Sequence, residues 1–296
     1  MTVAPEKKNG AGARTGGPGR PSSRAGRDRD RGPGRGRGVL VGLAYFFVPL
    51  VVLVVLWQIA TTVAPSPFFP PPVEIGENLV TLLVGGDAFF TAVFYEDLLA
   101  TVGRMLAGFA IGAAWGIVIG TAMGLSQASR ETVTPIVEFL RSIPATATLP
   151  LFIILLGGGD DMRIVFIAYG VSWFVLINTA SGVGSIHRTM LDLGKVFKIS
   201  PARRLFSIVL PAASPKIFAG LRIASTAALL LAIVSEFILA SNGIGFQLIQ
   251  AQGRFQLLNM WSWMLALALL GLLINVLLDA VENRVLSWHS LSRQKI

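Results

Sequence analysis

The chain of 296 residues contains no cysteine and only two histidines, His187 and His289. The absence of cysteine excludes disulfides, a thiol nucleophile, a cysteine zinc site and a lipidated cysteine. With two histidines, a histidine metal site or a Ser-His-Asp triad is not predicted. Charged residues are also scarce, at 14%, against roughly 25% in soluble domains, whereas 53% of residues are hydrophobic. The composition predicts an integral membrane protein.

Basic charge gathers in residues 1–38, which are rich in Arg, Gly and Pro and nearly free of large apolar side chains. Such a segment buries too little surface to offset the entropy of ordering. We therefore predict a disordered basic cytoplasmic tail that contacts anionic membrane lipid. The run RGPGRGRG at 31–38 also resembles an RGG-like nucleic-acid binder, but our prediction is a tail that binds no nucleic acid.

Six apolar runs are long enough to cross a bilayer as helices, which takes about 20 residues each. The first is too long for a signal-peptide core of about 7–15 residues, so we expect it to remain uncleaved. An outer linker, 64–97, follows it and begins with the proline-rich, extended stretch 64–72; residues 98–290 form a core with five spans. The predicted fold is all-α with six transmembrane helices, at 39–63, 98–125, 133–156, 163–183, 218–239 and 257–281.

The charge of the loops alternates with the order of the spans. The linker 64–97 and the loop 157–162 are acidic, whereas the insert 184–217 is strongly basic and has Asp192 as its single acidic residue. Because Lys and Arg are retained on the cytoplasmic side, the N-terminus, the C-terminus and the insert are predicted to be cytoplasmic.

The insert is amphipathic as well as basic. Met190, Leu193 and Phe197 recur at helical spacing, which predicts a first short helix at 189–197. Ser200 before Pro201 is typical of a helix start, so a second short helix is expected at 201–209. Such helices dock on lipid or in the groove of a partner, or they only join two spans, and the pattern leaves both possibilities open.

Two further prolines are predicted to divide the insert from the fifth span. Pro211 is expected to end the second short helix, because proline removes a helical hydrogen bond and its ring collides with the preceding turn. The pair Ser214-Pro215 repeats the helix-start signal and is expected to open the fifth span.

The insert resembles the cytoplasmic EAA loop of ABC-importer permeases, which runs Glu-Ala-Ala, three residues, Gly, nine residues and Ile-x-Leu-Pro. The stretch 208–211 (IVLP) matches its end, 192–194 (DLG) stands at the position of Glu-Ala-Ala, and Lys198 stands at the glycine. Residues 101–130, 135–157 and 224–249 are similar to spans of the sulfonate, taurine and nitrate permeases. The resemblance covers about 98–290 and omits the basic tail.

This resemblance implies a type I ABC-importer permease in a bacterial plasma membrane. The chain has no G-x-x-x-x-G-K-[ST] phosphate loop, so it would be non-catalytic and bind no cofactor or metal, with ATP and Mg on a partner. The implied partners are two ATPase subunits, a second permease (a homodimer) and an external solute-binding protein that delivers a small, anionic solute such as a sulfonate, taurine or nitrate. The residues implied to couple with the ATPase are Asp192, Leu193, Gly194, Phe197, Lys198, Ser200, Arg203, Leu205, Phe206, Leu210 and Pro211.

Two other classes are weighed against this one. A stand-alone secondary transporter or channel predicts ionisable relays within the membrane and internal symmetry, neither of which is evident, and it leaves the insert unexplained. An intramembrane enzyme would need histidine, cysteine or paired buried carboxylates.

Polar residues within the spans are the candidates for the translocation pathway. Pro144 and Pro150 interrupt the third span, and irregular backbone at membrane depth is tolerated where it lines a cavity or packs within protein. Glu236 either lines the pathway, pairs across helices, or lies solvated near the interface. The candidate pathway residues are Ser142, Pro144, Thr146, Thr148 and Glu236.

The remaining polar and small residues have simpler predicted roles. Glu138 and Arg141 are three residues apart, which predicts an ion pair within the helix. Asn178 and Asn275 are expected to bond between helices, and Arg222 is expected to reach the lipid headgroups. A small-residue face for close helix packing is predicted along the second span at Gly103, Gly108, Gly112, Gly116, Gly120 and Gly124.

Overall fold

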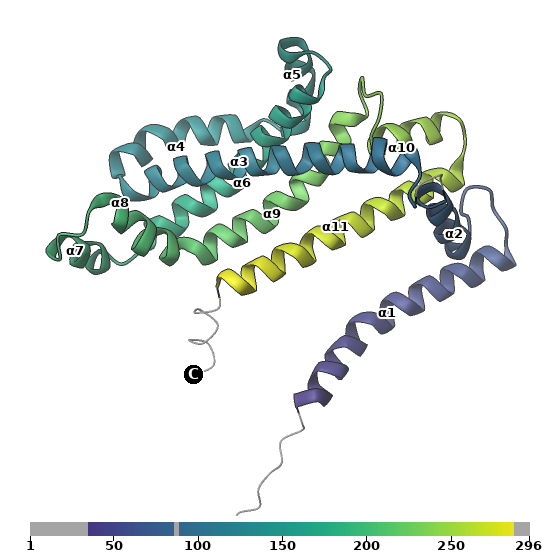
Figure 1. Ribbon diagram of the computed structural model, residues 1–296, viewed down its shortest axis with the longest axis horizontal. Coiled ribbons are helices and arrows are strands. Elements are labelled where there is room, and N and C mark those ends of the chain that lie inside the picture. Colours follow the sequence, from purple (N-terminus) through teal and green to yellow (C-terminus); the bar gives the residue numbers. More distant parts are fainter. Residues whose placement is uncertain (1–34, 86–88, 287–296) are drawn as a thin grey trace, which may run out of the picture. The chain divides into compact units, whose positions relative to one another are not determined.

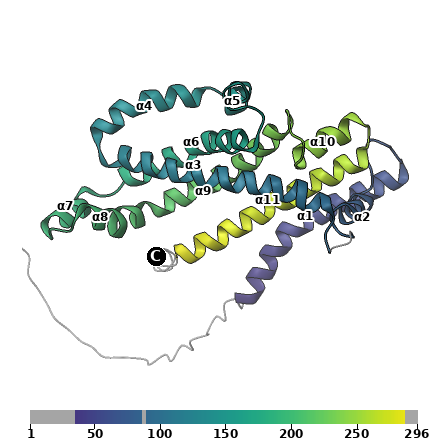
Figure 2. The same ribbon diagram turned by 45° about the horizontal axis from the view of Figure 1, so that its top comes forward.

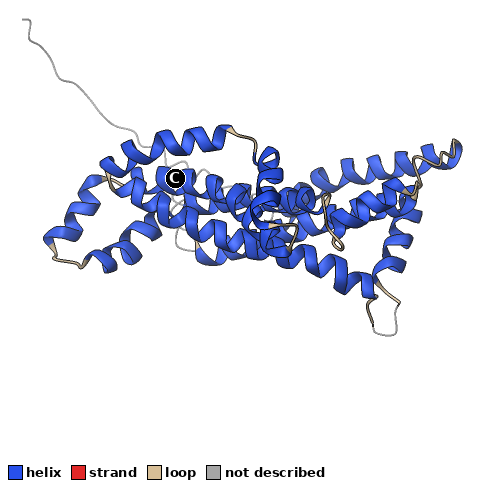
Figure 3. Ribbon diagram, turned by 90° about the horizontal axis from the view of Figure 1, so that it is seen from above, coloured by secondary structure: helices blue, strands red, loops and turns tan. Residues whose placement is uncertain are grey.

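The computed structural model of the protein describes residues 35–85 and 89–286, and all named elements in these ranges are helical (Figure 3). The predicted tail therefore lies outside the described residues, apart from 35–38, which belong to α1 (Arg35–Val63). The chain divides into two units, Met1–Val52 and Leu53–Ile296. The first unit contributes the beginning of α1, and the second contains all the elements that follow.

Four helical runs are long and apolar enough to cross a membrane (Figure 1). They contain α3 (Leu99–Leu125), α6 (Asp160–Gly184), α9 (Leu210–Glu236) and α11 (Leu257–Val285). These four confirm the predicted second, fourth, fifth and sixth spans to within a few residues, except at the start of α9. The predicted first span falls in α1, which has 29 residues and includes the apolar stretch Val48–Val63; that it crosses the membrane stays a prediction.

The predicted third span is a broken pair of helices. α4 (Gln127–Ser142) is followed by the segment Ala145–Leu156, which comprises a short 3-10 turn (Ala145–Thr148) and α5 (Leu149–Leu156). The two segments are bent by 81° at the break between them (Figure 2). Ile143 adopts extended backbone because the following Pro144 disfavours helical geometry at that position. Pro150 lies in the first turn of α5, where no helical hydrogen bond is lost, so the prediction that it interrupts the span is wrong.

The predicted glycine face packs α3 against α6. A Cβ atom added at Gly112 would lie 2.5 Å from the carbonyl oxygen of Ala168, and one added at Gly120 would lie 2.5 Å from that of Leu176. The backbones of the two helices therefore approach closely only because these positions lack side chains. Gly108, Gly116 and Gly124 make the same kind of approach, whereas nothing lies within 4 Å of Gly103. The prediction is confirmed at five of the six glycines.

α9 packs against both α6 and α3, and the main core forms where these three helices meet. Met105, Phe166, Val171 and Ala228 are fully or almost fully buried there. The linker is not simply extended. It contains α2 (Pro72–Leu83), which packs on α11 through hydrogen bonds of 2.9 Å from the Asn78 amide to Asn259 and Ser262. α10 (Ile244–Gly253) also packs on α11.

The fifth span begins in the insert without a break. α8 (Pro201–Arg204), a π-helical turn (Leu205–Val209) and α9 form one helical run, Pro201–Glu236. The prediction that Pro201 starts a helix is confirmed, but the predictions that Pro211 ends it and that Pro215 opens the span are wrong. In the π turn the Leu210 N–H donates to the Leu205 carbonyl, five residues back, and bypasses that of Phe206, so the wider turn takes up the distortion before Pro211.

Pro215 is tolerated inside α9 because the carbonyl it leaves free has another donor. A proline at 215 cannot bond to the Pro211 carbonyl four residues earlier. The Ser214 hydroxyl donates to that carbonyl oxygen at 2.8 Å instead. In the sequence Ser214 resembled a helix cap. In the structure its hydroxyl supplies the missing hydrogen bond inside a longer helix.

Candidate functional site

The insert folds as two helices that contact each other at a glycine. α7 (Arg188–Val196) packs against α8 and the π turn, and a Cβ atom added at Gly194 would lie 3.0 Å from the Arg204 side chain and 3.4 Å from that of Ile208. The predicted first helix is confirmed. Gly194 therefore sets the close approach of the two helices of the insert.

Lys198 occupies a left-handed backbone conformation, with φ of 53°. The Ile199 N–H donates to the Gly194 carbonyl at 3.0 Å, which is the bond that closes a helix of the Schellman type. A glycine usually occupies this left-handed position, and it is where the EAA pattern has its glycine. The turn between α7 and α8 thus keeps a glycine-like geometry with lysine in place.

The insert divides its apolar residues between the core and the surface. Val209 is 1% exposed and packs with Val183 and Ile217, with Leu205 and Leu210 beside them. Phe206 is 67% exposed, and Met190, Leu193, Val196 and Phe197 are also exposed. We call these five exposed residues the insert patch. Arg203 and Ser200 are exposed, and the Ser200 side chain makes no capping bond.

The pathway candidates at the break of the third span are only partly brought together. The Ser142 hydroxyl bonds to the Phe139 carbonyl and the Thr148 hydroxyl to the Ala145 carbonyl, both at 2.6 Å, so each caps its own helix turn. Thr146 is exposed. Pro144 lines a cleft of about 310 Å³ together with Arg141, Trp173 and Asn178.

Glu236 lies apart from these residues, in a buried ion pair. Its side chain is fully buried and its carboxylate lies 2.8 Å from the Arg104 guanidinium. The Thr101 hydroxyl and the Gly245 N–H donate to it at 2.9 Å. The alternative of a solvated side chain is wrong, and the alternative of a pair across helices is the one observed. The pair joins α3 to α9.

Arg104 connects Glu236 to two further segments. It lies 2.8 Å from Asp160 at the start of α6, and it donates to the backbone and side-chain oxygens of Asn242 at 3.2 and 2.6 Å. Asp97 extends the network by accepting from the Gly243 N–H at 2.7 Å. We call the set of Asp97, Thr101, Arg104, Asp160, Glu236 and Asn242 the buried network, after its buried members; Asp160, at its edge, is 60% exposed. It fixes the loop between α9 and α10.

The analysis of the sequence did not single out Arg104, although a signal was present. A charged residue inside an apolar span is costly unless it is paired, at roughly 2.5–3.5 kcal/mol on insertion scales. Arg104 lies inside the predicted second span and Glu236 inside the fifth. Two opposite charges in two apolar spans predict an ion pair between the spans, and the structure contains that ion pair.

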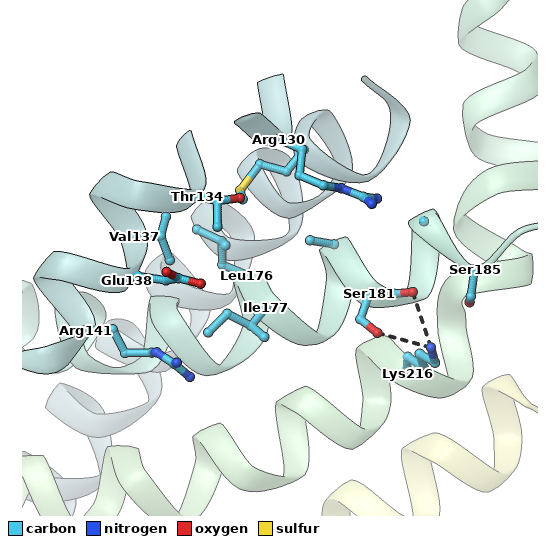
Figure 4. Close-up of a pocket in the computed structure, with 13 residues that line it drawn as sticks. Arg130, Thr134, Val137, Glu138, Arg141, Leu176, Ile177, Ser181, Ser185 and Lys216 are labelled. Atoms are coloured by element: carbon cyan, nitrogen blue, oxygen red, sulfur yellow. Dashed lines mark hydrogen bonds between the residues drawn. The ribbon is translucent and has the colours of Figure 1, made fainter. Parts of the chain in front are cut away.

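A larger cleft, of about 430 Å³, lies among α4, α6 and α9 (Figure 4). Arg130, Glu138 and Arg141 come from α4, and Lys216 from α9. The Lys216 ammonium donates to the Ser181 hydroxyl at 3.1 Å. No ion pair joins Glu138 to Arg141 in the described part of the chain, so the predicted pair within the helix is not formed.

The predicted bond of Asn178 to another helix is not formed. Asn178 donates to the Phe174 carbonyl at 2.8 Å within its own helix, and its side chain packs tightly against Gly220 of α9. Arg222 forms ion pairs with Asp279 and Glu282 of α11, and its reach to the lipid headgroups stays a prediction.

Long apolar helices, a broken span and a buried ion pair between two of the apolar helices define a multi-pass helical membrane protein. The chain belongs to the family of binding-protein-dependent transport system inner membrane components, whose pattern matches residues 112–287. It is therefore the non-catalytic permease component of an ABC transporter in the plasma membrane, with ATP bound by the partner ATPase. The alternative of a stand-alone transporter or channel is set aside.

Similar proteins support this assignment. The taurine transport system permease protein TauC of Escherichia coli (strain K12) is 32% identical over 241 residues, 81% of this chain and 87% of that protein. The putative aliphatic sulfonates transport permease protein SsuC of Bacillus subtilis (strain 168) is 28% identical over 241 residues, 81% and 85% of the two chains. A chain of the inward-facing MetNI methionine ABC transporter shares the fold, with a TM-score of 0.55, 18% identity and coverage of 65% of this chain and 96% of that one.

Proposed function

We propose that the chain forms, as a homodimer, the translocation pathway of an importer for a small solute that carries an anionic sulfonate group, with taurine as the leading candidate. The printed functions of TauC and SsuC support this solute class. In this proposal the permease has six spans of type I importer architecture, both termini are cytoplasmic, and an external binding protein delivers the solute.

The insert is the proposed contact with the ATPase. The observation that carries this proposal is the insert patch, whose apolar side chains project from two helices that are otherwise held to the core through Val209 and Leu205. Exposed apolar side chains with basic neighbours fit the groove of a protein partner. Asp192, Lys198, Ser200, Arg203 and Pro211 belong to this contact or shape it.

A change at Phe206 tests this contact. Phe206→Asp places a charge on the insert patch without disturbing the core, and we expect loss of ATPase co-purification and of ATP-driven uptake. Phe255→Asp is the matched control, because Phe255 is also an exposed phenylalanine but lies outside the insert. Leu205→Asp is a poorer test, since Leu205 packs against the core. Undiminished complex and uptake in Phe206→Asp would refute docking through the patch.

The absence of cysteine allows the orientation to be tested directly. Val196→Cys and Phe255→Cys each create a single thiol in an exposed position. We expect an impermeant maleimide added to intact cells to label position 255 and not position 196. Labelling of position 196 from outside would reverse the proposed topology.

A further inference from the structure

The cleft beneath α4 contains opposite charges that lack partners. Glu138 and Arg141 are three residues apart on one helix, where their Cβ atoms lie roughly 5–6 Å apart. Such residues commonly pair, yet neither makes an ion pair or a hydrogen bond within the described part of the chain. Both line the cleft, and Figure 4 shows them projecting to the same side of α4. Their charged groups are therefore available to a ligand.

The other walls of the cleft complete a small amphipathic site. Val137, Leu176 and Ile177 supply apolar surface. Arg130 lies close over Gly184, and it is about 12 Å from Glu138 along the helix axis, at 1.5 Å per residue. Arg130 is therefore a separate cationic contact at one end of the cleft. The volume of about 430 Å³ falls at the small end of the range for ligand sites.

The mixture of charges narrows the class of ligand. A simple anion would be attracted to Arg141 and Lys216 but repelled by Glu138. A simple cation would be attracted to Glu138 but repelled by Arg141 and Lys216. A ligand that carries an anionic oxygen group and a primary ammonium satisfies both. Guanidinium binds oxyanions through paired N–H donors, and a carboxylate accepts from an ammonium.

We propose that this cleft binds a zwitterion in which a short apolar link joins an oxyanion to a primary ammonium, with the oxyanion on Arg141 and the ammonium on Glu138. The assignment rests on the proposed function for its first source, an aminoalkyl sulfonate such as taurine. The same chemistry occurs in the headgroup of phosphatidylethanolamine, which is the second source. Glu138 selects the ligand in either case.

Binding to the complete transporter tests the proposal. The complex is placed in nanodiscs of phosphatidylcholine, and the affinities of taurine and of ethanesulfonate, which lacks the ammonium, are measured by calorimetry. Because one charge-assisted contact is lost, we expect Glu138→Gln to weaken taurine binding roughly tenfold or more and to leave ethanesulfonate within about twofold. Arg141→Gln is expected to weaken both ligands.

Glu131→Gln is the matched control. Glu131 lies on the same helix, outside the cleft, and accepts from the Gln127 side chain at 2.8 Å. It should leave both affinities unchanged. Unaltered elution and melting temperature of Glu138→Gln, with partial recovery in Glu138→Asp, separate an effect on the site from an effect on folding.

A second arm identifies the source of the ligand. If the site holds a lipid headgroup, phosphatidylethanolamine will be retained by the wild type and lost from Glu138→Gln, and adding it to the nanodiscs will suppress taurine binding. The proposal is overturned if Glu138→Gln alters neither ligand, or weakens ethanesulfonate as much as taurine. Absence of ATP-driven uptake of any sulfonate by the wild type would instead refute the proposed function.

Discussion

The buried network and the insert patch differ in whether their side chains find partners within the chain. At the end of α9, Glu236 and Arg104 are buried and meet partners within the chain at 2.8 Å. In the insert, Phe206 and its neighbours are apolar and exposed. A side chain that is satisfied internally serves stability and position, whereas an apolar side chain left exposed on a segment between spans points to a missing partner. Changes in the two regions should therefore separate stability from assembly.

Removal of one member of the buried pair should have the largest effect. Arg104→Ala leaves the Glu236 carboxylate buried without its cation, and we expect a loss of about 3–5 kcal/mol of unfolding free energy. Denaturation of the purified permease in mixed micelles measures it. Arg222→Ala, which removes an exposed pair to Asp279 and Glu282, should cost about 1 kcal/mol or less. A loss in Arg104→Ala no larger than that in Arg222→Ala would show that the buried pair stabilises the fold no more than an exposed pair does.

The glycine contact between α3 and α6 should give the next effect. Gly112→Ala forces a methyl group toward the Ala168 carbonyl, so we expect a loss of about 1–3 kcal/mol in the same measurement. Gly103→Ala has open space and should instead gain up to about 1 kcal/mol from helix propensity. A similar loss in both variants would contradict close packing at Gly112.

Two neighbouring residues of the insert should separate the two kinds of role. Val209→Ala removes buried apolar volume and should cost about 1–2 kcal/mol of stability. Phe206→Ala should change stability by less than about 0.5 kcal/mol and weaken the complex with the ATPase. Melting curves and co-purification on the same samples check both. The comparison between core and patch fails if the two variants behave alike.

The smallest effect is expected at Lys198. A residue other than glycine in the left-handed region costs about 1 kcal/mol, so Lys198→Gly should be stabilising by up to that amount. Lys198→Ala keeps the backbone cost and should show no such gain. The melting temperatures of the two variants, measured side by side, test whether only Lys198→Gly is stabilising.

Much of the fold could be predicted because apolar length and glycine spacing are local signals. The spans in α3, α6, α9 and α11 follow from hydropathy alone. The extent of α9 could not be predicted, because the fates of Pro211 and Pro215 depend on a π turn and on the Ser214 hydroxyl. The sequence shows that a proline removes a helical hydrogen bond, but it does not show whether another donor, here the Ser214 hydroxyl, replaces that bond.

The candidate site was predictable to a lesser degree. The helical spacing of the insert indicated an amphipathic pair, but it did not show which apolar residues face the core. The structure turns Leu205 toward the core and Phe206 outward. Both residues lie in the π turn Leu205–Val209, whose wider backbone shifts the register of the helix faces. Similarly, the spacing of Glu138 and Arg141 predicted an ion pair. They form none in the described part of the chain, where both line the cleft that α4 makes with α6 and α9.

The helical run Pro201–Glu236 has 36 residues, and at 1.5 Å per residue it is about 54 Å long. Phe206 lies near one end and Glu236 at the other. If the ATPase docks on the insert as proposed, a force applied at Phe206 acts on one helical lever arm, whose far end is bonded to Arg104 through Glu236. The π turn at its base is where such an arm has its least regular backbone, and tilting the arm must either bend that turn or move the tie.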